Sequence, residues 1–79
     1  MAVDVIRTTT VSSLGIVVAP GRATNIRVDI RRVIGKVRQA AVLGTANKPY
    51  AVGGLAIRVV PINFTFQKGV RYDISFTAT

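Results

Sequence analysis

Residues 55–79 read LAIRVVPINFTFQKGVRYDISFTAT and contain the two clearest strand patterns in the chain. Apolar and polar residues alternate in two segments, whose apolar members are Ile62, Phe64 and Phe66 in the first and Tyr72, Ile74 and Phe76 in the second. A period of two is typical of strands that bury one face. The connector between the segments contains Gly69, which can adopt the positive φ of a hairpin turn. We therefore predict a C-terminal hairpin at 62–77.

The aromatic residues place the core on this hairpin. The chain has two tyrosines and three phenylalanines, and all but Tyr50 lie within 62–77. Aromatic side chains bury the largest apolar areas, so the inner face of the hairpin is the expected centre of the core.

Further strand patterns precede the hairpin and are separated by turn residues. Residues 2–10 alternate and end at two serines, and residues 14–19 end at Pro20 and Gly21. Residues 44–54 are rich in turn formers and predict the longest loop. Pro61 cannot donate a ladder hydrogen bond, so it marks an edge position, a bulge or a corner between sheets.

Residues 25–43 fit two patterns. Polar and apolar residues alternate strictly over 25–31, yet the apolar residues of this region also share one face of a helix. Three features favour strand, bend and strand over a helix. The segment has many β-branched residues, glycine stands at position 35, and Val28 would face solvent on a helix. On a strand Arg32 lies on the inward side, which implies a bulge at Arg31–Arg32 or the end of burial there.

Short strands at regular spacing, with glycine and proline between them, predict an all-β fold, a small β-sandwich or barrel. The 79 residues make one domain, 1–79. Residues 1–10 are expected to be an edge strand or an extended N-terminal arm that adds a strand to another subunit.

Composition excludes several kinds of site. The chain has no cysteine and no histidine, which removes disulfides, thiolate zinc sites and the commonest general base. The three aspartates lie on polar strand faces, and two of them have arginines on the same face, so Asp29 is expected to pair with Arg27 or Arg31, and Asp73 with Arg71. The serines lack a base, and no glycine motif matches a phosphate-binding loop. We expect no enzyme, metal, cofactor or small-molecule substrate.

The apolar fraction is 49%, against 18% charged residues. A chain of this size cannot hide so much apolar surface in one core, which predicts a homo-oligomer. The longest apolar runs are far too short to span a bilayer, and the N-terminus does not read as a secretory signal. We therefore expect no membrane partner, and a location in the cytoplasm or in a particle assembled there.

The net charge of +8 predicts an anionic partner. The candidate partner-binding residues gather within 22–38 and are Arg22, Arg27, Arg31, Arg32, Lys36 and Arg38. Arginine pairs well with carboxylates and with phosphates, so the contact could be an acidic protein surface or nucleic acid. Exposed aromatics usually accompany single-strand binding, and here only Tyr50 is a candidate, which favours the protein surface.

The segments VVAPGRATNIRVDI (17–30) and FQKGVRYDISFTAT (66–79) resemble the strand-turn-strand texture of immunoglobulin-like modules. A short, cysteine-free chain of this texture resembles the small β-domain accessory proteins of bacteriophage virions, such as capsid decoration or cement proteins. The resemblance implies a non-enzymatic structural protein of the virion that oligomerises and docks on a larger assembly. The alternative is a small basic β-protein that binds nucleic acid non-specifically through residues 22–38.

Overall fold

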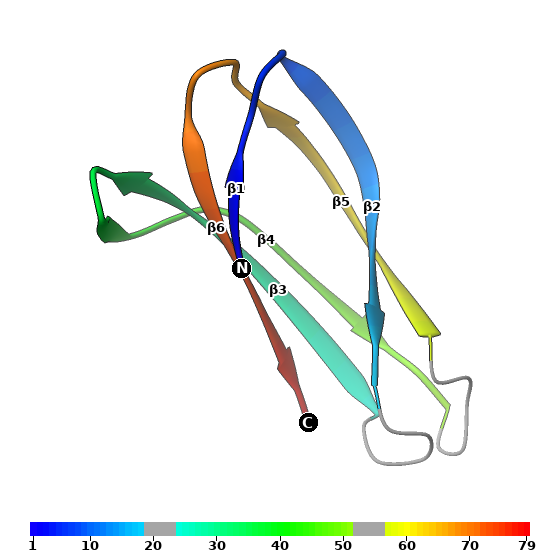
Figure 1. Ribbon diagram of the computed structural model, residues 1–79. Coiled ribbons are helices and arrows are strands. Elements are labelled where there is room, and N and C mark those ends of the chain that lie inside the picture. Colours follow the sequence, from blue (N-terminus) through cyan, green and yellow to red (C-terminus); the bar gives the residue numbers. More distant parts are fainter. Residues whose placement is uncertain (19–23, 52–56) are drawn as a thin grey trace.

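Six strands make up the fold. The computed structural model describes residues 1–18, 24–51 and 57–79, of which 77% lie in strands and none in a helix (Figure 1). The strands are β1 (Ala2–Asp4), β2 (Thr9–Val17), β3 (Asn25–Ile34), β4 (Val37–Pro49), β5 (Ile57–Phe66) and β6 (Arg71–Ala78). The all-β prediction is confirmed. No helix that could cross a membrane is found in the part of the chain that the structure describes.

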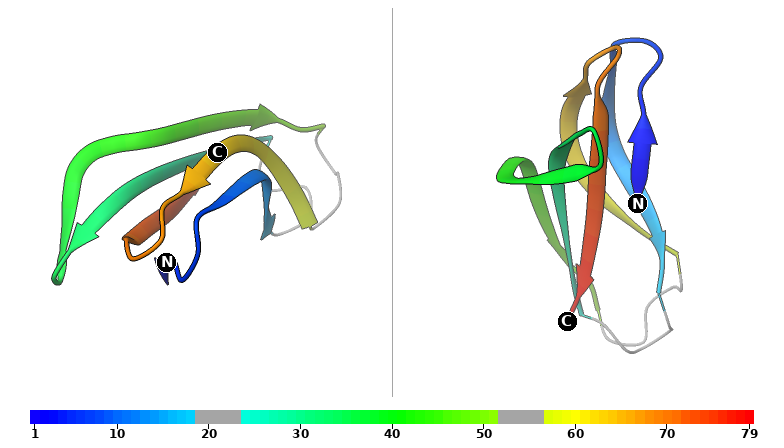
Figure 2. Two further views of the ribbon diagram at one scale, coloured as in Figure 1. Left: turned by 90° about the horizontal axis from the view of Figure 1, so that it is seen from above. Right: turned by 60° about the vertical axis from the view of Figure 1, so that its left-hand side comes forward.

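The strands form two antiparallel sheets that face each other (Figures 1 and 2). One sheet has four strands in the order β1-β6-β3-β4, and the other pairs β2 with β5. The arrangement is a sandwich. Its core consists of the side chains that point inward from both sheets, and the buried hydrophobic members are Ile26, Val28, Ile30, Val60, Phe66, Tyr72 and Ile74.

Strand β3 supplies the most deeply buried part of this core. Ile26, Val28 and Ile30 are 0% exposed, and the alternating residues point to the opposite face. The strand reading of 25–43 is therefore confirmed over the helical one. The bend at 34–36 is also confirmed, because Gly35 takes a positive φ of 63° in the turn between β3 and β4.

The predicted hairpin at 62–77 is wrong in its pairing. Strand β5 pairs with β2, whereas β6 pairs with β1 and β3, so the connector 67–70 crosses from one sheet to the other. Gly69 does have the expected positive φ, 79°. Alternation shows that each strand buries one face. It does not show whether two such strands pair in one sheet or face each other from two sheets, because both arrangements give the same pattern.

Facing sheets bring the aromatic rings together across the core. Phe64 and Phe66 on β5 meet Tyr72 on β6 in edge-to-face contacts, with centroids 5.7 and 5.0 Å from the tyrosine ring. Phe64 and Phe66 also contact each other at 4.8 Å. Such pairs add about 0.5–1.5 kcal/mol to the burial of area. The prediction that these aromatics contribute to the core is confirmed, although Phe64 and Phe76 are only half-buried.

Residues 2–10 do not form one strand. Strand β1 ends at Asp4, and the chain bends and enters the other sheet as β2 at Thr9. The bend at 5–8 contains no glycine or proline, so the sequence did not reveal the change of sheet. The N-terminal segment is an edge strand on β6, in agreement with that part of the prediction. Ser12 and Ser13 do not end a strand, because both lie inside β2.

Pro61 lies beside a bulge between β2 and β5, one of the three places expected for it. Ser13 faces Pro61 and Val11 faces Phe64, so two residues of β5 oppose one residue of β2. One of the two is Asn63, whose φ of 48° is left-handed. Asparagine tolerates this conformation better than most residues.

The loop predicted at 44–54 is wrong for its first part, because β4 continues to Pro49. A Cβ on Gly44 would lie 2.7 Å from a ring carbon of Phe64, so glycine serves close packing here and not a turn. Tyr50 N donates to Thr24 O, which directs the nitrogen of Pro49 away from β3. Proline has no N–H, but the nitrogen of Pro49 points away from the ladder with β3, so no ladder hydrogen bond is lost. Residues 52–54 of the predicted loop, and the turn at Pro20 and Gly21, lie outside the described residues.

Candidate functional site

The outer face of the four-stranded sheet carries an array of ion pairs. Arg27 and Asp29 both point outward from β3, and Arg27 Nε donates to Asp29 Oδ1 at 3.1 Å. Thr45 on β4 donates its hydroxyl to the same oxygen at 2.9 Å. The pairing of Asp29 with Arg27 is thus confirmed.

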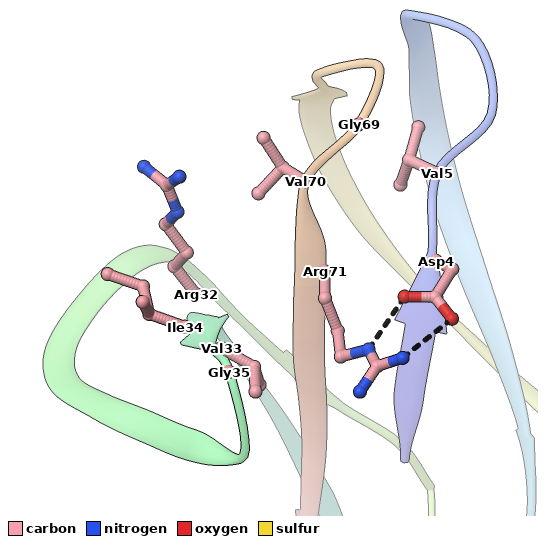
Figure 3. A pocket seen from close by; sticks show the side chains of 9 residues that line it. All are labelled: Asp4, Val5, Arg32, Val33, Ile34, Gly35, Gly69, Val70 and Arg71. Atoms are coloured by element: carbon pink, nitrogen blue, oxygen red, sulfur yellow. Dashed lines mark hydrogen bonds and ion pairs between the residues drawn. The ribbon is translucent and has the colours of Figure 1, made fainter.

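Asp73 does not pair with Arg71, contrary to expectation. Arg71 instead holds Asp4 with two hydrogen bonds of 2.6 and 3.0 Å (Figure 3). The register explains the difference, because Asp4 lies directly opposite Arg71 across the β1–β6 ladder, whereas Asp73 is on the same strand. These bonds hold the pKa of Asp4 below its ordinary value and raise the pKa of Arg71.

Asp73 binds three other groups. Ser75 donates its hydroxyl at 2.9 Å, and the N-terminal amine and Arg38 each lie 3.5 Å away. The serine hydrogen bond is the main cause of a lowered pKa at Asp73, with the N-terminal charge and Arg38 adding to it. All three aspartates of the chain are therefore engaged with cations of their own sheet face.

The candidate partner-binding residues do not form one surface. Arg27, Arg31 and Arg38 lie on the outer face, where Arg27 and Arg38 are ion-paired. Arg32 lies on the inward side of β3, opposite Tyr72, and its side chain is exposed. Burial therefore ends at Arg32, which is one of the two outcomes expected. The bulges at this point belong to β4, since the β3–β6 ladder is regular. Lys36 lies in the β3–β4 turn, and Arg22 lies outside the described residues.

One end of the sandwich collects cations from distant parts of the sequence. We call it the loop end; it comprises the neighbouring connectors 5–8 and 67–70, the turn 35–36, which projects to the left of them in Figure 1, and the adjoining Arg32 and Arg71. Lys68 N donates to Thr8 Oγ1 at 3.1 Å, and Gly69 N donates to Val5 O at 2.8 Å, so two of the connectors touch.

A concave pocket of about 460 Å³ lies among these connectors (Figure 3). Residues from all three connectors and from the ends of β1, β3 and β6 line it, including both Arg32 and Arg71. Each connector also carries one exposed cation, and these are Arg7, Lys36 and Lys68. Sequence reasoning missed Arg7 and Lys68. Because alternate connectors of antiparallel strands lie at the same end, the predicted turns at 34–36 and 67–70 could have linked Lys36 to Lys68.

A second feature is an arm, defined as residues 34–43, which projects from the body of the sandwich (Figures 1 and 2). Seven residues of β4, 37–43, belong to it, and only Gln39 among them is half-buried. Its large apolar side chains are exposed by 40–64%, and they are Ile34, Val37, Val42 and Leu43. No strand in the described ranges pairs with β4 on the side away from β3.

Two more apolar surfaces lie on the β2–β5 side. Val17 and Ile57 form a cross-strand pair on the outer face of the small sheet, next to Val59, and all three are exposed. An apolar groove of about 540 Å³ opens between β1 and β2, where Val3, Leu14 and other core residues reach its wall. The groove is open because β1 has only three residues.

Tyr50 is not a free stacking platform. Arg58, 2% exposed, places its guanidinium carbon 4.8 Å from the centroid of the Tyr50 ring. The Tyr50 hydroxyl donates to the carbonyl of Val59. This cation–π contact holds the end of β4 against β5, so both residues serve the fold.

The described ranges contain no cluster of three or more His, Cys, Asp or Glu side chains that could hold a metal ion. Comparison with known proteins finds no matching family model, no similar curated protein and no similar solved structure. The function is therefore argued from the surfaces alone.

Proposed function

We propose that this protein is a non-enzymatic structural subunit that oligomerises through its arm and docks on a larger assembly. The observation that carries the proposal is the uncovered apolar surface of residues 34–43. Full burial of an aliphatic side chain of this size is worth about 1.5–3 kcal/mol. The four side chains of the arm are about half exposed, so covering those of both copies in a twofold contact is worth about 6–12 kcal/mol, which is of the order of the cost of association.

The proposed partner of the arm is a second copy of the chain. Over residues 37–43 the open edge of β4 carries one charge, Arg38, and no proline, so the bulges of β4 are the one usual feature that opposes edge pairing there. Two copies related by a twofold axis can place these edges antiparallel and extend both four-stranded sheets into one. The same axis brings the exposed apolar side chains of the two arms together.

Docking on a larger assembly is the second part of the proposal. The outer face of β2–β5, with Val17, Ile57 and Val59, stays available when the arms pair, because it belongs to the other sheet. The resemblance in sequence texture would make the assembly a bacteriophage capsid, with this protein a decoration or cement subunit of the virion.

The alternative function, nucleic-acid binding through a stripe at 22–38, has less support. Arg27 and Arg38 already bind carboxylates. Arg31 lies on the outer sheet face, whereas Arg32 and Lys36 lie at the loop end. The described members of this set offer no single cationic surface.

Native mass measured over a range of concentrations tests the oligomer. We expect the wild type to be a dimer or a multiple of a dimer, and the variant Val37→Ser/Leu43→Ser to be a monomer of unchanged circular dichroism. The matched control is Val17→Ser/Ile57→Ser, which removes exposed aliphatic groups of similar size from the other sheet and should leave the mass unchanged. A wild type that stays monomeric at every concentration would overturn the proposal.

A further inference from the structure

We infer that the loop end binds the phosphate backbone of nucleic acid without preference for base sequence; the loop end shares Ile34, Gly35 and Lys36 with the arm, so binding is compared at one oligomeric state. This surface shares Arg32 and Lys36 with the stripe at 22–38 and adds cations from distant parts of the sequence, so it exists only in the folded chain. Its cations come from three connectors and two strand ends, and they are Arg7, Arg32, Lys36, Lys68 and Arg71.

The charge of this surface is not neutralised by the protein itself. Asp4 is the one carboxylate at the loop end, and it is held by Arg71. Asp29 and Asp73 are engaged on the outer sheet face. Arg7, Arg32, Lys36 and Lys68 are exposed and form no ion pair with any residue in the described ranges. Five cations against one carboxylate leave a local charge of +4.

The arrangement suits a chain of phosphates better than a single small anion. The cations come from three connectors and two strand ends: Arg32 and Arg71 line the pocket of about 460 Å³, Lys36 and Lys68 follow or precede its lining glycines, and Arg7 lines the neighbouring groove between β1 and β2. A nucleic-acid backbone presents a negative charge at every nucleotide, so it can contact cations on several connectors at once.

Composition favours nucleic acid over an acidic protein. The centres of protein–protein interfaces are depleted of lysine and built around apolar and aromatic anchors. Surfaces that bind nucleic acid are rich in lysine and arginine and are polar. Here Val5, Val33, Ile34 and Val70 line the pocket beside Arg32 and Arg71, but no aromatic residue does so. The adjoining turns carry two exposed lysines, Lys36 and Lys68. Without an aromatic platform or groups placed to read bases, the contact is to the backbone and carries no sequence preference.

The test uses the three lysines of the chain as a matched set. Lys36 and Lys68 are exposed in turns at the loop end, whereas Lys48 is exposed on β4 near the opposite end, where it faces Ile26. Each is changed separately to glutamine, and native mass is checked so that the oligomeric state is the same in every sample. Binding of a fluorescent 20-base-pair duplex of arbitrary sequence is then followed by anisotropy from about 25 to 200 mM salt.

We expect the wild type to bind with a log–log salt slope of about −3.5, as four neutralised phosphates would give. Lys36→Gln and Lys68→Gln should each make the slope shallower by about one, on every duplex alike, and Lys48→Gln should leave it unchanged. An equal effect of all three variants, or no binding at 25 mM salt, would overturn the inference. Poly-glutamate that competes as well as duplex per charge, with the same dependence on Lys36 and Lys68, would also overturn it in favour of an acidic protein partner.

Discussion

Ile30 and Ile34 lie on the same side of the same strand, yet their surroundings are opposite. Ile30 is 0% exposed beneath the β2–β5 sheet, and Ile34 is 55% exposed in the arm. Both belong to the residues of β3 that point inward, which are every second residue from Ile26 and include Arg32. The alternation of apolar and polar residues thus determines which way a side chain points. Whether another sheet covers it depends on where the facing strand ends, which alternation does not encode.

The largest expected effect comes from comparing these two isoleucines directly. Ile30→Ala should lower the free energy of unfolding by about 2–5 kcal/mol, because it leaves a cavity between the sheets. Ile34→Ala should change it by no more than about 0.5 kcal/mol when measured at a concentration where the protein is monomeric. Urea denaturation followed by circular dichroism measures both values. Equal losses would mean that the arm is covered within one chain.

Gly44 marks the place where β4 passes from the arm to the covered part of the sandwich. Gly44→Ala should cost about 1–3 kcal/mol, since the new Cβ would lie 2.7 Å from a ring carbon of Phe64. Gly15→Ala is the matched control, because its Cβ would meet nothing closer than a backbone oxygen at 3.9 Å. The control should be neutral or slightly stabilising. A harmless Gly44→Ala would show that the Phe64 ring can move away and that packing is loose at this boundary.

The smallest effect concerns the surface ion pairs that hold β1 and the arm to β6. The pKa values of Asp4 and Asp73 are lowered in the folded protein, so their stabilising effect is present above the ordinary value of 3.8 and is lost as pH falls below it. The thermal midpoint should therefore decrease more between pH 4 and about pH 2 in the wild type than in Asp4→Asn/Asp73→Asn. An equally steep decrease in both proteins would show that these pairs contribute nothing to acid sensitivity.

The strand segments could be predicted from the sequence, but their partners could not. Alternation located the inner faces of 62–66 and 72–76, and glycine at position 69 correctly indicated the turn between them. It did not show that these strands lie in different sheets, because pairing and facing bury the same residues. For the same reason the passage from β1 to β2 was read as one strand. Gly44 was taken for a loop residue, although it makes room for a distant ring.

The candidate site shows the same limit. A cluster of basic residues within 22–38 was visible in the sequence, but the fold distributes its described members over two surfaces and neutralises two of them. The loop end gathers Arg7, Lys36 and Lys68, which are far apart in the chain. The predicted turns at 34–36 and 67–70 could have placed Lys36 and Lys68 at one end, but the bend at 5–8 that brings Arg7 there was read as part of a strand.

The central claim, that the arm is uncovered in one chain and becomes covered by a second copy, is tested most directly by hydrogen exchange of the backbone amides at two protein concentrations. The account predicts that β3 amides at Val28 and Ile30 are protected at both concentrations. Amides of 38–43 that face the open edge of β4 should exchange quickly in dilute protein and become protected in concentrated protein, and Val37→Ser/Leu43→Ser should remove that gain. Exchange over 38–43 that is equally fast at both concentrations, in a sample whose mass shows assembly, would contradict the account.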